Sequence, residues 1–211
     1  MRRVIGGPLT AIARAIDRPW VTPDRITVAG LVLGVASAVT AGLALWGLAL
    51  GLWLVSRVLD GLDGSLARVR RARANAAAGA AAGAGSSEAG GFLDIVADFI
   101  AYGATVFGVA VGASLQFGAP WWPFALVLVA YYVNGAAFLA FSSIAERTGR
   151  RIDDGRSLSF LGRIAEGTET IVVHSVWLIL PMFAWQVAVV WAVFVAASAA
   201  QRIVVGYRAL R

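Results

Sequence analysis

The chain has 211 residues, of which 59% are hydrophobic and only 14% are charged. Its mean hydropathy of +0.77 excludes an ordinary soluble domain and favours a helical protein that crosses the membrane several times. It contains no cysteine, which excludes disulfide bonds and thiolate metal sites. All 18 basic residues are arginines, and the formal net charge is +6. Because the arginines gather at the ends of apolar segments and not along one face, we expect no nucleic-acid partner.

Residues 1–20 are predicted to form a short amphipathic helix that lies in the membrane interface, ahead of a main domain at residues 21–211. The apolar residues that repeat at helical spacing here are Ile5, Leu9, Ile12 and Ile16, and arginines surround them. The stretch lacks the continuous apolar run and cleavage site of a signal peptide, so we expect no cleaved leader.

Six apolar segments follow, at roughly residues 26–46, 48–68, 91–113, 121–145, 164–181 and 184–206. Their lengths suit membrane-spanning helices, so we predict an all-α domain with six transmembrane helices. Connections rich in arginine alternate with connections that lack it, which puts 17 of the 18 arginines on one side. By the positive-inside rule this side, with both termini, is cytoplasmic. Residues 74–90 are an Ala/Gly-rich insertion on that side, predicted to be a flexible connector or a loose extension of the second span.

Two pairs of aspartates lie inside these apolar segments. Asp60 and Asp63 are three residues apart in the second segment, and Asp94 and Asp98 are four apart in the third. Each spacing puts a pair on one helix face, and carboxylates in such segments mark functional sites. Counted from the arginine-rich ends, both pairs lie roughly 6–12 Å deep. We therefore expect the pairs to meet and to bind a divalent cation such as Mg²⁺, which prefers oxygen ligands.

The aspartates also allow two other interpretations. They would be purely structural if they paired with Arg57 and Arg68, but four acids against two cations leave surplus negative charge. A cation transporter would want its acids near the bilayer midplane, with access from both sides. Their position near one interface favours a site open to the cytoplasm. Arg57, one turn before Asp60, is interpreted as balancing the surplus charge, with direct phosphate contact as the alternative.

The residues around the aspartates form a more specific pattern. The two stretches read Asp60-Gly-Leu-Asp63-Gly64-Ser-Leu-Ala67-Arg68 and Gly90-Gly-Phe-Leu-Asp94-Ile-Val-Ala-Asp98. Together they resemble the signature of the CDP-alcohol phosphotransferases, D-x-x-D-G-x-x-A-R followed by G-x-x-x-D-x-x-x-D, at every fixed position. The stretch TPDRIT at residues 22–27 is similar to the family's T-P-N-x-[IL]-T, with Asp24 in place of Asn. The 21 residues between Arg68 and Gly90 exceed the family's usual gap, and the insertion accounts for the excess.

The resemblance, which extends over residues 20–205, implies an enzyme of membrane phospholipid synthesis. An alcohol would attack a CDP-linked lipid, usually CDP-diacylglycerol, with release of CMP. The implied ligands of two divalent ions, Mg²⁺ or Mn²⁺, are Asp60, Asp63, Asp94 and Asp98. Asp98 would also be the catalytic general base on the acceptor hydroxyl. The implied donor-binding residues are Asp60, Gly64, Ala67, Arg68 and Gly90. A metal clamp and the planar guanidinium fork of Arg68 suit a diphosphate.

A second polar cluster opens the fifth apolar segment. Glu166 and Glu169 are three residues apart on one helix face, and this stretch resembles G-G-L-x-E-G-T-E-T-I in a bacterial branch of the family. The resemblance implies that Arg156, Glu166 and Glu169 bind the acceptor; the alternative is hydrogen bonding among helices, with Glu166 pairing Arg163. His174 is interpreted as packed. The resemblance also implies a homodimer in the bacterial inner membrane, and the alternative within the family is a different CDP-alcohol donor.

Overall fold

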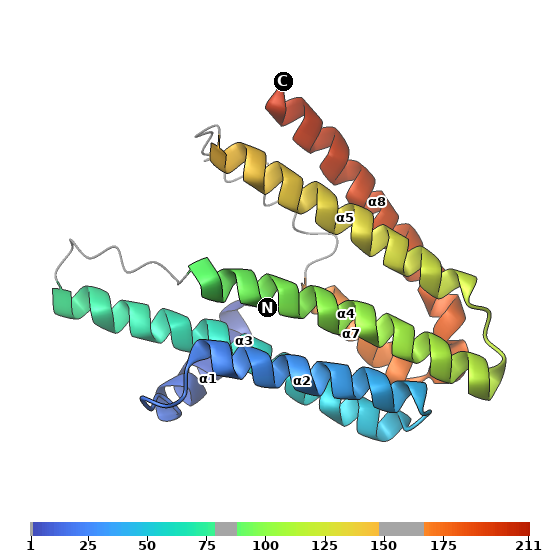
Figure 1. Cartoon of the computed structure of the whole chain (residues 1–211), viewed down its shortest axis with the longest axis horizontal. Helices are drawn as coiled ribbons and strands as arrows, with labels where there is room; N and C mark the ends of the chain where they lie inside the picture. The colour runs from blue at the N-terminus through green and yellow to red at the C-terminus, as the bar shows by residue number, and fades with distance from the viewer. Residues whose placement is uncertain (1, 79–87, 148–166) are drawn as a thin grey trace. The chain divides into compact units, whose positions relative to one another are not determined.

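The computed structural model describes residues 2–78, 88–147 and 167–211, and within these ranges the chain is helical apart from short turns (Figure 1). The helices are α1 (Arg2–Ala15), α2 (Pro23–Gly42), α3 (Trp46–Ala78), α4 (Glu88–Phe117), α5 (Trp122–Arg147), α7 (Gly167–Ile179) and α8 (Ala184–Leu210), with a 3₁₀ turn η1 (Pro181–Phe183) before α8. No strand occurs in the described ranges. The all-α prediction is confirmed.

Four helical stretches of the described chain are long and apolar enough to cross a membrane. They are α2, α4, α5 and the stretch Pro181–Leu210, which joins η1 to α8. Two of the six predicted spans do not meet this criterion. Every 18-residue stretch of α3 carries at least three charged residues, and the described part of α7 is only 13 residues long. The structure therefore has four candidate spans by length and composition, and six remains a prediction.

The chain divides into two compact units, each of which is described by itself. Unit 1 comprises Met1–Thr40 and Gly47–Thr105, and unit 2 comprises Ala41–Trp46 and Val106–Arg211. Helix α1, α3 apart from Trp46, most of α2 and the first part of α4 therefore belong to unit 1. All four signature aspartates lie in unit 1.

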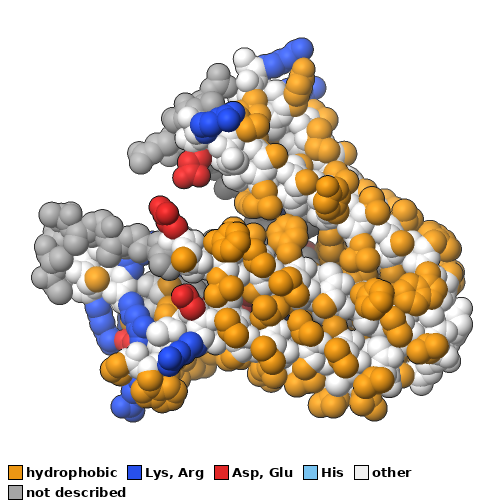
Figure 2. Space-filling view, viewed as in Figure 1, with side chains coloured by type: hydrophobic (Ala, Val, Ile, Leu, Met, Phe, Trp, Pro, Cys, Tyr) orange, Lys and Arg blue, Asp and Glu red, His pale blue; other side chains and the backbone are white. Residues whose placement is uncertain are grey.

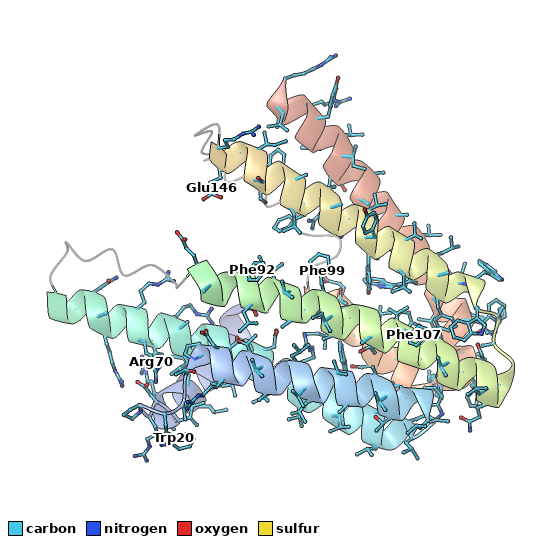
Figure 3. All side chains as sticks on the ribbon, viewed as in Figure 1. Trp20, Arg70, Phe92, Phe99, Phe107 and Glu146 are labelled. Carbon is cyan, nitrogen blue, oxygen red and sulfur yellow. The ribbon has the colours of Figure 1, made fainter. Side chains whose placement is uncertain are left out.

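Helix α1 packs against the second half of α3. Its Leu9 and Ala13 join an apolar cluster with Leu62, Leu66 and Val69 of α3, while Ile12 is exposed. After the helix ends, the Asp17 carboxylate accepts a hydrogen bond from Arg70 at 2.9 Å and pairs with Arg73. Arg70 extends from α3 toward α1 (Figure 3). The helix forms as predicted, but part of its apolar face contacts protein, so the interfacial placement remains a prediction.

Helix α2 lies unusually close to α3 and α4 at two glycines one turn apart. A Cβ atom at Gly34 would lie 3.1 Å from Oγ of Ser56 on α3 and 3.2 Å from Cβ of Ala101 on α4. At Gly30 the carbonyl oxygen accepts a hydrogen bond of 2.7 Å from the Ser56 hydroxyl. Small residues four apart let membrane helices approach closely, so this pair sets the distance between α2 and the helices that carry the aspartates.

We expect Gly34→Val to destabilise the protein by about 1–3 kcal/mol, because the added carbon atoms must push α3 and α4 away. Thermal unfolding in detergent measures the effect. Gly51→Val is the matched control, since a Cβ atom at Gly51 meets nothing within 4 Å. Equal losses in the two variants would mean that the close approach at Gly34 contributes nothing to stability.

In unit 2, α5 packs along α8 (Figure 1). Polar side chains of α5, α7 and α8 also meet. The Tyr131 hydroxyl accepts a hydrogen bond of 2.7 Å from Nε1 of Trp191 and lies 3.0 Å from Nε2 of His174. His174 is fully buried, and its ring centre lies 4.8 Å from that of Trp177 in a tilted arrangement. The interpretation of His174 as a packed, hydrogen-bonded residue is confirmed.

The Ala/Gly-rich insertion begins as helix. Residues 74–78 are the last turn of α3, which extends ten residues beyond Arg68, and residues 88–90 are the first turn of α4. This agrees with the predicted extension of the second span. Residues 79–87, the centre of the insertion, lie outside the described ranges.

Candidate active site

The four aspartates of the signature come from two neighbouring helices. Asp60 and Asp63 lie on α3, and Asp94 and Asp98 lie in the first half of α4. Asp60 on α3 and Asp98 on α4 pair with the same guanidinium, that of Arg57, so the two helices bring their carboxylates into one cluster. Figure 2 shows charged side chains near α1 and the adjoining ends of α3 and α4, and also at the ends of α5 and α8, whereas hydrophobic side chains cover most of the rest of the visible face. The predicted meeting of the two helix faces is present in unit 1.

Arg57 lies between the two pairs. Its Nη1 atom is 2.7 Å from Oδ1 of Asp98 on α4 and 3.7 Å from Oδ1 of Asp60 on α3. The guanidinium is buried, with 6% of the side chain exposed, whereas the side chains of Asp60 and Asp98 are 29% and 34% exposed. One nitrogen atom thus connects carboxylates on two helices, and the interpretation of Arg57 as a counter-charge to the aspartates is confirmed.

The guanidinium is itself held by aromatic rings and a hydroxyl. Its carbon atom lies 4.9 Å from the ring centre of Trp53, one turn earlier on α3, and 5.2 Å from that of Tyr102, one turn after Asp98 on α4. Nη2 donates a hydrogen bond of 3.0 Å to the Ser56 hydroxyl, which bonds in turn to α2. Desolvated cation–π contacts of this kind are favourable and directional. Three helices therefore fix the position of Arg57.

Asp63 is the most buried of the four aspartates, with 5% of the residue exposed. Its Oδ2 atom accepts a hydrogen bond of 2.5 Å from the Thr27 hydroxyl on α2, and its Oδ1 atom accepts one of 2.5 Å from the backbone N–H of Gly64. Thr27 is the last residue of the TPDRIT stretch. This stretch therefore has a physical role, because it fixes one signature carboxylate from a third helix.

We expect Thr27→Val to lower the free energy of unfolding by about 1.5–3 kcal/mol, because a buried carboxylate loses a hydrogen bond while the side-chain volume hardly changes. Thr27→Ser keeps the hydroxyl and is the control. Unfolding of both variants is compared in the same detergent. A valine variant as stable as the serine variant would show that this hydrogen bond does not hold Asp63.

The sequence matches the CDP-alcohol phosphatidyltransferase family over residues 20–199. The chain belongs to this family. It is 36% identical over 177 residues to the inner membrane protein YnjF of Escherichia coli (strain K12). This alignment covers 82% of this chain and 75% of YnjF. These matches make it an integral membrane protein and a transferase of substituted phosphate groups.

A solved structure shares the fold of this phosphatidyltransferase. It is the phosphatidylinositol phosphate synthase PgsA1 of Mycobacterium tuberculosis with CDP-DAG bound, superposed with a TM-score of 0.61. The superposition covers 96% of this chain and 91% of PgsA1, at 22% sequence identity. At this identity the likeness concerns the fold.

The carboxylate cluster has the chemistry that a hard divalent cation requires. Its donors are all carboxylate oxygens, and after pairing with Arg57 they keep a surplus of negative charge. Within the described ranges, no three acidic or histidine side chains are already arranged to hold a metal ion. The guanidinium of Arg57 lies between Asp60 and Asp98. The donor set fits Mg²⁺ or Mn²⁺, and the metal-ligand assignment stays a prediction.

The residues assigned to the donor nucleotide lie on α3 between Asp60 and Arg68 and at the start of α4. Gly64 leaves room for Arg68, whose Nη1 atom would lie 3.3 Å from a Cβ atom there. Arg68 donates a hydrogen bond of 2.9 Å to Ser65 and lines a cavity of about 530 Å³ between α1 and α3, together with Arg14 and Arg73. It pairs with none of the four aspartates in the described structure, so the structural alternative is wrong for this residue.

The residues assigned to the acceptor are described only in part. Glu169 is exposed in the first turn of α7, in unit 2. Arg156 and Glu166 lie outside the described ranges. Their shared role with Glu169 therefore stays a prediction.

Residues that sequence reasoning did not assign also shape the site. Ser56, Trp53 and Tyr102 hold Arg57, and Gly30 and Gly34 bring α2 against them. The glycine pair has a recognisable small-residue spacing, and Trp53 and Tyr102 lie one turn from charged residues. Neither signal identifies the partner helix by itself.

Proposed function

We propose that this enzyme transfers a phosphatidyl group from CDP-diacylglycerol to an alcohol and releases CMP, with divalent ions bound by its four signature aspartates. The observation that carries the proposal is the convergence of Asp60 on α3 and Asp98 on α4 at one nitrogen of Arg57. Membership of the family supports the reaction type. The CDP-DAG bound in PgsA1, which shares the fold, supports the donor.

Asp60, Asp63, Asp94 and Asp98 would hold the divalent ions. When bound, Mg²⁺ or Mn²⁺ would neutralise the charge of the donor diphosphate and of its transition state. This need explains why the chain carries four carboxylates at a membrane surface, where uncompensated charge is costly. The buried Asp63 is fixed by Thr27 and Gly64, whereas Asp60 and Asp98 are partly exposed and can reach substrate.

Asp98 is the proposed general base. Its carboxylate accepts the proton of the acceptor hydroxyl while the alcohol oxygen attacks the phosphorus that bears the diacylglycerol. The bond from this phosphorus to the oxygen it shares with the second phosphate breaks, and CMP leaves with that oxygen. The guanidinium of Arg68, together with Asp60, Gly64, Ala67 and Gly90, would bind the nucleotide end of the donor. A planar fork suits two phosphate oxygens at once.

The acceptor site is proposed to include Arg156, Glu166 and Glu169. Carboxylates suit an acceptor with several hydroxyl groups or a cationic alcohol, whereas a phosphorylated alcohol would use nearby arginines. We further propose six transmembrane spans, with α3 and the apolar segment 164–181 as the two additional ones. Both termini and the active site would face the cytoplasm of a bacterial inner membrane, and the enzyme would be a homodimer.

The experiment that tests this function supplies the purified enzyme with CDP-diacylglycerol, Mg²⁺ and one alcohol at a time. The alcohols include glycerol phosphate, inositol phosphate, serine and choline, and mass spectrometry detects the new phospholipid. We expect one acceptor to give product together with an equal amount of CMP. CMP release with no acceptor-derived lipid in any reaction, or no consumption of CDP-diacylglycerol, would contradict the proposed transfer.

A further inference from the structure

Arg57 is set apart from the other arginines by its position. The other 17 lie near the ends of apolar segments, whereas Arg57 is in the middle of the apolar segment 48–68, three residues before Asp60. Its side chain is almost completely buried. A basic side chain at such a depth is costly unless it is paired, so its partners indicate what it does.

Those partners are carboxylates that the proposed function assigns to divalent ions. A single atom, Nη1, contacts Oδ1 of Asp60 and Oδ1 of Asp98. Because Nη1 lies 2.7 Å from the Asp98 oxygen and 3.7 Å from the Asp60 oxygen, these two carboxylate oxygens must lie close to each other. In the described structure, no other basic side chain pairs with any of the four aspartates.

The contacts of the Arg57 side chain favour a fixed position. The fully buried ring of Trp53 and the ring of Tyr102 on α4 both contact the guanidinium. The Ser56 hydroxyl links the guanidinium to Gly30 on α2. A side chain that approached a phosphate of the substrate would need a free donor edge directed toward solvent. Arg57 instead directs Nη1 at two carboxylates and is enclosed by rings, which favours an internal role over substrate contact.

Charge explains why such a residue is needed. Four ionised carboxylates in one cluster repel one another, and this repulsion is strongest when no divalent ion is bound. A fixed guanidinium reduces the net negative charge of the cluster by one. It also attracts the Asp98 carboxylate of α4 toward the Asp60 carboxylate of α3. The divalent ions, once bound, perform the same task with a larger charge.

We propose that Arg57 is a built-in cation that holds Asp60 and Asp98 together across α3 and α4 while the divalent ions are absent. It is a positioning residue: it acts through Asp98 and does not touch the reacting atoms. Its part in preparing the ion site rests on the proposed function, whereas its coupling to Asp98 in metal-free protein does not. Mg²⁺ should therefore make Arg57 less important for stability.

The test compares thermal unfolding of the purified protein in a chelator and in saturating Mg²⁺. In chelator, Arg57→Gln should lower the unfolding temperature by roughly 6–10 °C, because it leaves carboxylates without their counter-charge. In Mg²⁺ the loss should shrink by at least about half. In chelator, Arg57→Gln introduced into the Asp98→Asn variant should lower the unfolding temperature by less than half as much as it does in the wild type, because the two residues act as a pair.

Arg70→Gln is the matched control, since Arg70 pairs with Asp17 outside the cluster. This substitution should lower the unfolding temperature equally in chelator and in Mg²⁺. If Arg57→Gln protein cannot be purified, Arg57→Lys, which keeps the charge but not the planar fork, undergoes the same comparison. An equal loss with and without Mg²⁺, together with full additivity with Asp98→Asn, would reduce Arg57 to a packing residue. A wild-type protein that Mg²⁺ does not stabilise would count against the proposed ion site instead, and the coupling in chelator would still decide the role of Arg57.

Discussion

Asp98→Asn is expected to reduce CMP release by about 10³-fold, within the range that general-base catalysis contributes. Asparagine keeps nearly the same volume and one oxygen atom, so the packing of α4 against α3 should survive. It cannot accept the proton of the acceptor hydroxyl, and its neutral amide gives Arg57 no ion pair. The measurement is CMP release from CDP-diacylglycerol with each protein at equal concentration. Thermal unfolding of each protein verifies that the variant is folded.

Asp24→Asn is the matched control for this substitution. Asp24 is exposed at the start of α2, outside the carboxylate cluster, and asparagine at this position agrees with the family pattern. We expect its CMP release to stay close to that of the wild type. An Asp98→Asn enzyme that retained more than about a tenth of the wild-type rate would contradict the role of Asp98 as the base.

Removal of divalent ions is expected to lower CMP release by about 100-fold or more, and added Mg²⁺ or Mn²⁺ should restore it. The expectation follows from charge: a diphosphate and four carboxylates, with the single guanidinium of Arg57 as their counter-charge, would otherwise meet in one small volume. Metal ions contribute several kcal/mol to such transition states. The assay uses protein dialysed against chelator, with ions then added stepwise. Undiminished turnover after the dialysis, with metal content verified by elemental analysis, would refute the metal dependence.

The features that could be predicted from the sequence are those that depend on local spacing. The positions of Asp60 and Asp63 on one face of a helix, and of Asp94 and Asp98 on another, follow from helical periodicity alone. The membrane character of α2, α4, α5 and α8 follows from runs of apolar residues. The extension of α3 to Ala78 follows from alanine, which favours helix even where it has little to bury.

The partners of individual side chains could not be predicted in the same way, because they depend on how helices pack. The sequence indicated that Arg57 would balance the aspartates, but not that it would contact Asp98 on α4 more closely than its own neighbour Asp60. The bond from Thr27 to Asp63 spans 36 residues and requires α2 to approach α3 at Gly30 and Gly34. Arg68, a possible ion-pair partner in sequence, bonds to Ser65 instead.

Diffraction from crystals of the enzyme grown with Mn²⁺ and CDP-diacylglycerol tests the central claim most directly, because the anomalous signal of manganese locates the ions independently of the protein. The account predicts manganese peaks within coordination distance of Asp60, Asp63, Asp94 and Asp98, beside the donor diphosphate. Peaks confined to other residues, with the four carboxylates free of metal while the donor is bound, would contradict it.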